Sequence, residues 1–233
     1  MGSANRPAPP CVLRRLSGQS VRMARTEAKP GWSAASFVPD TKSLPALAKA
    51  SQECRGCPLW QPAMQTVFGE GRRSSALMLI GEQPGDKEDV QGHPFVGPAG
   101  RILWECVDDA GISRDDVYAT NAVKHFKHEL RGKRRLHKKP NTAEIEACHP
   151  WIDAELRAVG PSVIVALGAT AARSLLGRTT SIAASRGNRF DVHGRPTLVT
   201  YHPSAVLRAD ERATEIRHAL VDDLRLARAW AVR

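Results

Sequence analysis

The chain has 233 residues and a formal net charge of +10, and 42% of its residues are hydrophobic. This length suffices for one domain with a buried core, and no apolar run approaches the length of a membrane span. The basic amino-terminal stretch lacks the continuous apolar segment of a secretory signal. We therefore expect a cytoplasmic protein with no membrane contact.

The positive charge is concentrated in two segments. Residues 124–139 hold eight Lys or Arg and one acid, and residues 1–30 hold six Lys or Arg and one acid. The rest of the chain is close to neutral. Such concentration favours a polyanion as partner, although a solvated loop and a disordered tail are the plain structural alternative.

The amino-terminal part of the chain divides into an extension and the start of a domain. Residues 1–40 are rich in Pro, Ser, Arg and Ala without clear periodicity, and we expect a mostly disordered extension ahead of a domain over 41–233. A short helix over 44–51 leads into Cys54-x-x-Cys57. This pair precedes the first strong strand, which favours a metal or cluster clip over a redox pair.

Apolar runs alternate with helical segments along the rest of the chain. Strands are predicted over 76–81, 117–123, 162–168 and 196–201, the last as the second arm of a hairpin that begins with 189–193. Helices are predicted over 99–110, 141–159, 169–176 and 210–232. Asn141 and Glu144 form a capping-box-like start for one of them. The alternation predicts an α/β protein, a three-layer α/β/α sandwich with a four-stranded, mainly parallel central sheet.

Polar motifs follow several of these strands. Gly-Glu-Gln-Pro-Gly at 81–85 follows the first strand, Asn121 lies near the end of the second, and His202 follows the fourth. In such sheets, ligands bind outside the carboxyl ends of the strands. Three distant segments are therefore predicted to converge on one cleft, which indicates a site more strongly than any single motif does.

Each of these features also has a structural interpretation. The 81–85 motif matches no Walker loop or dinucleotide fingerprint, so no nucleotide cofactor is expected, and it is also typical of a turn. Phe95, between two glycines, belongs either to the core or to a platform for a planar base. A buried Asn121 either caps a loop or reads the edge of a base. His202 is either structural or a donor to a developing oxyanion.

The run Lys133-Arg134-Arg135-Leu136-His137 places a histidine at the end of a row of cations. Cations attract phosphates, and a neutral imidazole is a nucleophile. The sequence predicts a basic loop here that delivers His137 to a sugar in DNA, where the imidazole attacks.

Four motifs occur in order: Gly-Glu-x-Pro-Gly, Gly-x-Pro-Phe-Val-Gly, Thr-Asn-x-Val-Lys and His-Pro-Ser. Over roughly residues 50–229, this ordered set resembles the iron–sulfur uracil-DNA glycosylases of family 4. Gly-Glu-Gln-Pro-Gly together with the inserted basic loop resembles the UdgX branch. Members of that branch excise uracil and become covalently attached to the DNA through the loop histidine. Leu136 replaces the isoleucine usual in the branch, which is a mild change.

The resemblance implies a [4Fe-4S] cluster held by Cys54, Cys57, His125 and Cys148. His125 stands where the family has a cysteine, and imidazole can replace thiolate on cluster iron. The alternative is a free His125 and a different metal. The remaining cysteines of the five are Cys106, expected as a small buried hydrophobe, and Cys11, expected to be idle.

The resemblance also implies roles in base excision for the residues at the strand ends. Uracil would stack on Phe95, its edge would be read by Asn121, and His202 would stabilise the leaving anion. Glu82 would orient the nucleophile His137. Gln83 would hold uracil or exclude the competing water, and Gly81 would also contact uracil. The residues expected to contact DNA are Lys133, Arg134, Arg135, Ser204 and Arg208.

The expected partner is uracil-containing DNA, preferably single-stranded, and the protein is expected to act as a monomer. Two alternatives stay open. One is an ordinary multiple-turnover glycosylase that uses water as the nucleophile. The other is a non-catalytic DNA-binding protein clipped by a metal such as zinc.

Overall fold

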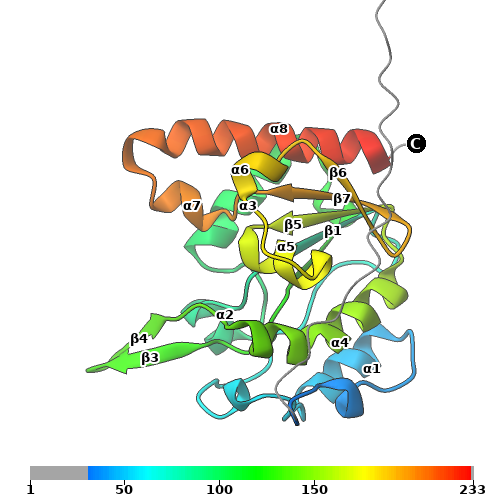
Figure 1. The fold of residues 1–233 in the computed structure, drawn as a ribbon, viewed down its shortest axis with the longest axis vertical. Coiled ribbons are helices and arrows are strands. Elements are labelled where there is room, and N and C mark those ends of the chain that lie inside the picture. The colour runs from blue at the N-terminus through cyan, green and yellow to red at the C-terminus, as the bar shows by residue number, and fades with distance from the viewer. Residues whose placement is uncertain (1–30, 232–233) are drawn as a thin grey trace, which may run out of the picture.

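The computed structural model describes residues 31–231. A five-stranded sheet in the order β2-β1-β5-β7-β6 lies between two layers of helices (Figure 1). Its strands are β1 (Leu77–Gly81), β2 (Val117–Asn121), β5 (Val163–Leu167), β6 (Arg189–Val192) and β7 (Arg195–Thr200). All neighbours are parallel except β6, which pairs antiparallel with β7. The three-layer prediction is confirmed, but the sheet has five strands and not four, because the first hairpin arm joins its edge.

Helices cover both faces of the sheet. One layer holds α3 (Pro98–Asp109) and α8 (Ala213–Ala231), and the other holds α4 (Thr142–Val159) and α5 (Ala169–Leu176). Along β1, Leu79 packs into the first layer and Ile80 into the second, and both are fully buried. Burial on both faces explains why the central strands are continuous apolar runs. None of the described helices is long and apolar enough to span a membrane.

A third apolar cluster lies on the far side of α4, where α1 (Leu44–Ser51), η1 (Ala35–Phe37) and η2 (Pro58–Trp60) pack. Ala34 is buried there, and its backbone N–H donates to the carbonyl oxygen of Ala147 at 2.8 Å. Residues 31–40 therefore belong to the folded body, which corrects the expected boundary at residue 41. Residues 1–30, including Cys11, lie outside the described residues.

The helix ends follow local signals. α4 begins with a complete capping box, in which Asn141 Oδ1 accepts from the Glu144 N–H at 2.9 Å and Glu144 Oε2 accepts from the Asn141 N–H at 2.7 Å. It ends at Gly160, whose φ of 64° is left-handed. The predicted bounds 44–51 and 169–176 are those of α1 and α5. η4 (Asp210–Arg212) precedes α8.

The basic run forms a β-hairpin, not the predicted loop. β3 (His128–Arg131) pairs antiparallel with β4 (Arg134–His137), and Gly132 in the turn has a φ of 59°. The hairpin projects from the body on the same side as α7 (Ser204–Leu207) (Figure 1). Besides α7, η1 and η2, the sequence also did not indicate α2 (Asp86–Gln91), α6 (Ile182–Ser185) and η3 (Arg114–Asp116).

Candidate active site

Gly81, Asn121 and Phe95 come together at the carboxyl edge of the sheet. Gly81 ends β1 and is paired in register with Asn121, which ends β2. A Cβ atom on Gly81 would lie 2.4 Å from Oδ1 of Asn121 and 2.7 Å from Cζ of Phe95. Glycine is therefore needed here, because any side chain would separate the aromatic ring from the amide.

The backbone of Phe95 is held in an uncommon conformation. Its φ is 56°, in the left-handed region that bulky residues rarely adopt. Gly100 packs so closely that a Cβ atom there would lie 1.9 Å from the carbonyl oxygen of Phe95. Trp104 Nε1 donates to the same oxygen at 3.3 Å. Enforced conformations of this kind cluster at ligand sites, as a fixed aromatic platform requires.

The amide of Asn121 is prepared for a ligand. Its Oδ1 atom is buried and accepts no hydrogen bond from any described residue. Its backbone carbonyl oxygen is held by Lys124 Nζ at 2.9 Å. An unpaired buried acceptor costs free energy, so the arrangement favours a donor supplied by a bound molecule.

His202 is held as a neutral donor. Its Nδ1 accepts from the backbone N–H of Ser204 at 3.2 Å and contacts the Ser204 hydroxyl at 2.7 Å. A backbone N–H can only donate, so Nδ1 carries no proton and Nε2 carries it. Burial, reinforced by the charge of Arg208, lowers the pKa of His202 to about 4. Nε2–H is thus available to a ligand oxygen.

The predicted nucleophile His137 ends β4 and faces Glu82. Nε2 of His137 lies 3.4 Å from Oε1 of Glu82, and the His137 side chain is 49% exposed. The other carboxylate oxygen, Oε2, accepts a hydrogen bond from the hydroxyl of Thr170. The sequence analysis missed Thr170. Thr170 could have been found from its position, because it follows the parallel strand β5 just as the other site residues follow or end their own strands.

Gln83 is engaged with the hairpin. Its Oε1 accepts from the backbone N–H of Lys127 at 3.2 Å, and its Nε2 donates to the carbonyl oxygens of Lys127 and Lys138, both at 3.1 Å. Both amide protons are therefore in use. This differs from the predicted contact with uracil or water and assigns Gln83 to the base of the hairpin.

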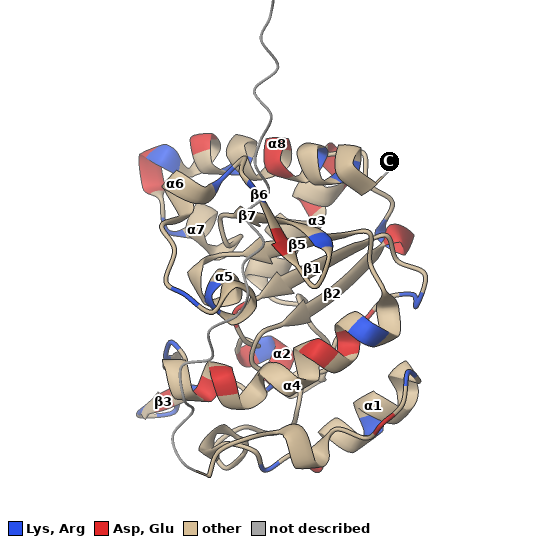
Figure 2. Cartoon of the chain, turned by 45° about the vertical axis from the view of Figure 1, so that its right-hand side comes forward, with Lys and Arg blue, Asp and Glu red and all other residues tan. Residues whose placement is uncertain are grey.

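The cations of the hairpin fall into two groups. Arg135 is partly buried and forms ion pairs with Asp86 and Asp89 on α2. Lys133 and Arg134 are exposed and form no ion pair with any described residue. Figure 2 shows where Lys and Arg (blue) and Asp and Glu (red) lie along the chain, including the end of the hairpin near β3. The three predicted DNA contacts therefore differ. Arg135 anchors the hairpin, whereas Lys133 and Arg134 are available to contact phosphates.

The remaining predicted phosphate contacts lie after β7. The hydroxyl of Ser204 is used by His202, as described above. Arg208, directly after α7, is exposed. Arg208 is thus the better placed of the two for a phosphate.

Three predicted cysteine ligands lie in one apolar cluster. Cys54, Cys57 and Cys148 are all buried. The Sγ of Cys54 accepts from Trp151 Nε1 and the Sγ of Cys148 accepts from the backbone N–H of Lys124, both at 3.3 Å. Burial raises the pKa of Cys57 to about 11 and, more strongly, that of Cys148.

His125 is the fourth predicted ligand, although no group of three or more His, Cys, Asp or Glu side chains within residues 31–231 is arranged to hold a metal ion. It directly follows Lys124, and burial, together with the charge of Arg55, lowers its pKa to about 4. A neutral imidazole and three thiols are chemically suited to iron or zinc once the thiols lose their protons. Cys106 is also fully buried but lies in the core cluster beside α3, as expected of a small hydrophobe.

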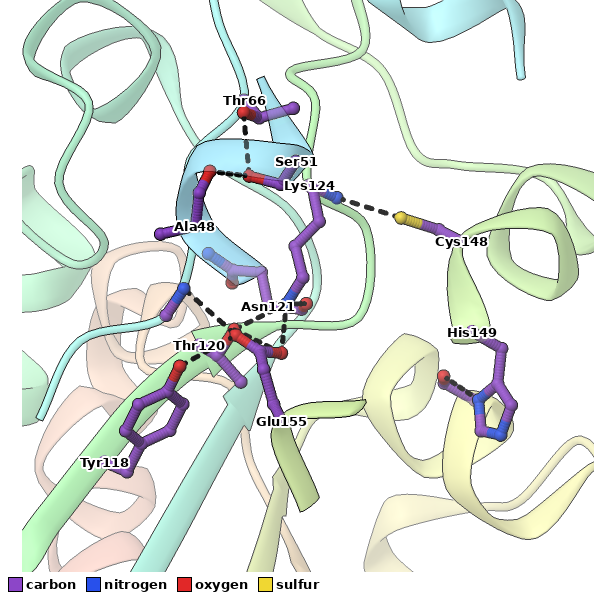
Figure 3. Close-up of polar contacts among 12 residues, drawn as sticks. Ala48, Ser51, Thr66, Tyr118, Thr120, Asn121, Lys124, Cys148, His149 and Glu155 are labelled. Carbon is purple, nitrogen blue, oxygen red and sulfur yellow. Dashed lines mark hydrogen bonds and ion pairs between the residues drawn. The ribbon is translucent and has the colours of Figure 1, made fainter. Parts of the chain in front are cut away.

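A buried polar network lies beside Asn121 (Figure 3). Lys124 Nζ contacts Glu155 Oε2 at 2.5 Å and donates to Thr120 Oγ1 at 2.6 Å, in addition to holding Asn121. Glu155 Oε1 accepts from the Tyr118 hydroxyl at 3.0 Å. The sequence analysis did not identify this network. A glutamate among the apolar positions of the predicted helix over 141–159 was the available signal.

Fold and site together define an α/β protein with an aromatic ring and an unpaired amide oxygen side by side at the edge of its sheet. The chain matches the family model of the uracil DNA glycosylase superfamily over residues 68–225, and it belongs to that superfamily. It is 37% identical over 181 residues to a Type-4 uracil-DNA glycosylase of Thermotoga maritima, covering 77% of this chain and 90% of the relative.

Two further relatives belong to the same group of proteins. A Type-4 uracil-DNA glycosylase of Saccharolobus solfataricus is 34% identical over 192 residues, covering 78% of this chain and 84% of the relative. A Type-5 uracil-DNA glycosylase of Pyrobaculum aerophilum is 33% identical over 126 residues, covering 48% and 52%. The superfamily that the four ordered motifs predicted is therefore confirmed.

Proposed function

We propose that this protein is a uracil-DNA glycosylase that excises uracil, preferentially from single-stranded DNA, and is then joined through His137 to C1′ of the deoxyribose. One observation carries the proposal: the imidazole of His137, at the end of β4, faces the carboxylate of Glu82 at 3.4 Å, directly after Gly81 at the sheet edge. His202 shares the sheet edge with Phe95 and Asn121. The relatives named as uracil-DNA glycosylases support the excision step.

Base selection follows from the hydrogen-bonding edge of Asn121. The target base leaves the stack and lies on Phe95, next to the space that Gly81 provides. Uracil offers the N3–H donor beside the O4 acceptor, which suits the unpaired Oδ1 of Asn121 and its NH₂ group. Cytosine presents a bare N3 and an amino group at these places. Cytosine is rejected because both pairings are then reversed.

His202 promotes cleavage of the N-glycosidic bond. When the bond between N1 and C1′ breaks, its electron pair stays on uracil and the sugar becomes oxocarbenium-like. Nε2–H of His202 donates to the uracil carbonyl oxygen on which negative charge develops. Because the donor is already neutral and oriented by Ser204, little reorganisation is needed during the reaction.

His137 then captures the sugar. The lone pair on the ring nitrogen that faces away from Glu82 forms a bond to C1′, and the ring becomes positively charged. The Glu82 carboxylate faces the other nitrogen and balances this charge. The product is a stable histidine–sugar bond, so each protein molecule acts once.

The hairpin brings His137 to the DNA. Gln83 and Arg135 fix its base and its side against the body. Lys133 and Arg134 extend beyond these anchors and neutralise phosphates.

Cys54, Cys57, His125 and Cys148 would hold a [4Fe-4S] cluster. When bound, such a cluster would supply a structural clamp between the Cys-x-x-Cys segment and α4. His125 and Cys148 flank the hairpin on either side in the sequence. Their attachment at one place fixes both ends of the segment that carries His137.

The test is a denaturing gel of the purified protein with a uracil-containing single-stranded oligonucleotide, beside the His137→Ser variant. We expect a shifted band that survives heat and detergent and is absent from the variant. Free abasic product without a shifted band would instead identify an ordinary multiple-turnover glycosylase. If metal-loaded protein gives neither a shifted band nor abasic product, the remaining candidate is a metal-clipped DNA-binding protein.

A further inference from the structure

Glu82 is held at its main chain and at one carboxylate oxygen. Its carbonyl oxygen accepts from the backbone N–H of Val123 at 3.1 Å, which continues the pairing of β1 with β2. Oε2 accepts from the Thr170 hydroxyl, and Oε1 faces His137. Within residues 31–231, Thr170 is the one side chain that donates a hydrogen bond to this carboxylate, and the imidazole of His137 faces it at 3.4 Å.

The position of Thr170 is fixed more firmly than that of Glu82 or of His137. It is 2% exposed and is the second residue of α5, an element packed on the sheet. A hydroxyl has a single proton, and this one is given to Glu82. The start of a helix also favours a neighbouring negative charge. The threonine therefore determines which carboxylate oxygen turns towards the hairpin.

The separation of 3.4 Å between Glu82 and His137 makes this orientation important. A normal charge-assisted hydrogen bond is shorter, so a small rotation of the carboxylate decides whether the contact tightens or is lost. The His137 side chain is half-exposed on the hairpin and does not itself fix the orientation of the carboxylate.

We propose that Thr170 is a positioning residue for the covalent step, an inference that rests on the proposed function. Its hydroxyl holds one oxygen of Glu82 so that the other receives the imidazole N–H of His137. This fixes the tautomer and leaves the opposite ring nitrogen with a lone pair for C1′. Without the hydroxyl, the carboxylate rotates and water captures more of the sugar cation.

The test compares three variants in single-turnover reactions with a uracil-containing single-stranded oligonucleotide. Thr170→Val keeps the shape and removes the donor, and Thr170→Ser restores the donor. Ser174→Ala is the matched control, because Ser174 lies one turn further along α5 and its hydroxyl contacts His149. The measured quantity is the cross-linked fraction of all excised sites, with free abasic sites revealed by alkali.

We expect this fraction to fall about tenfold in Thr170→Val, as for the loss of a hydrogen bond to a charged group. It should return in Thr170→Ser and stay at the wild-type value in Ser174→Ala. A wild-type fraction in Thr170→Val, an equal defect in Thr170→Ser, or a parallel loss of excision and thermal stability would each overturn the proposal. A wild-type protein that excises uracil but forms no adduct would instead overturn the covalent function itself.

Discussion

The two histidines of the site differ in chemistry because their surroundings differ. His202 is enclosed beside Gly168, where a Cβ atom would lie 2.9 Å from the Cβ of His202. Its enclosure and the Ser204 contact fix a neutral donor. His137 is half-exposed and faces a carboxylate. In the proposed reaction, the same type of side chain therefore serves as donor in one place and as nucleophile in the other.

The low pKa of His202 predicts the pH dependence of excision. Because this pKa is about 4, the imidazole stays neutral above about pH 5, and uracil release in single-turnover assays should show no step near pH 6.5 that originates from His202. The unfolded chain binds a proton at this position below about pH 6.5. His202 therefore makes the free energy of unfolding decrease as the pH falls from 6.5 towards 4.

Removal of the donor gives a second check on His202. His202→Ala should slow uracil release roughly 100- to 1000-fold, the usual effect of losing one preorganised oxyanion donor. Release of uracil at the wild-type rate would exclude the assigned role. A step near pH 6.5 that disappears in this variant would contradict the neutral state.

At the scale of elements, local signals predicted the helices better than the hairpin. The capping box at Asn141 predicted the start of α4, and apolar runs predicted β1, β2, β5 and β7. The charged residues of β3 and β4 show no apolar alternation, so no strand was indicated there. The pair is held by tertiary contacts from Gln83 and Arg135, which local sequence does not reveal.

The buried ion pair of Lys124, just after β2, with Glu155 of α4 should show strong coupling. Glu155→Leu leaves the ammonium of Lys124 buried without its carboxylate, and we expect the free energy of unfolding to fall by about 3–5 kcal/mol. The double variant Lys124→Met with Glu155→Leu should be less destabilised than this single variant. Urea unfolding measures the free energy of unfolding of each variant. If the losses of the single substitutions add up in the double variant, the two charges do not depend on each other.

At the scale of the whole molecule, the fold collects residues that are far apart in the sequence. The parallel order of β2, β1, β5 and β7 places the segments after all four strands at one edge. Gly81, Asn121, Thr170 and His202 follow or end these strands. The cysteine group lies beyond this sheet and depends on α4 and the segment before β1 for its place, whereas the hairpin is anchored by Gln83 and α2, which follow β1.

The proposed cluster predicts a difference between the cysteines. Cys54→Ser should lower the yield of folded protein, the thermal midpoint and the visible absorbance of the cluster together, because it releases the clamp on the hairpin. Cys106→Ala is the control, since this residue is buried in another cluster and should leave the visible absorbance intact. Equal absorbance in Cys54→Ser and wild type would remove Cys54 from the ligand set.

The sequence by itself determined the class of fold, the superfamily and the meeting of 81–85, Asn121 and His202 at one edge. Apolar periodicity and parallel-strand geometry are local or general rules, so one chain suffices to apply them. Only the tertiary structure decided that Gln83 and Arg135 anchor the hairpin and that Thr170 holds Glu82. These roles depend on which partners lie within hydrogen-bond distance across long stretches of sequence, and packing alone sets those distances.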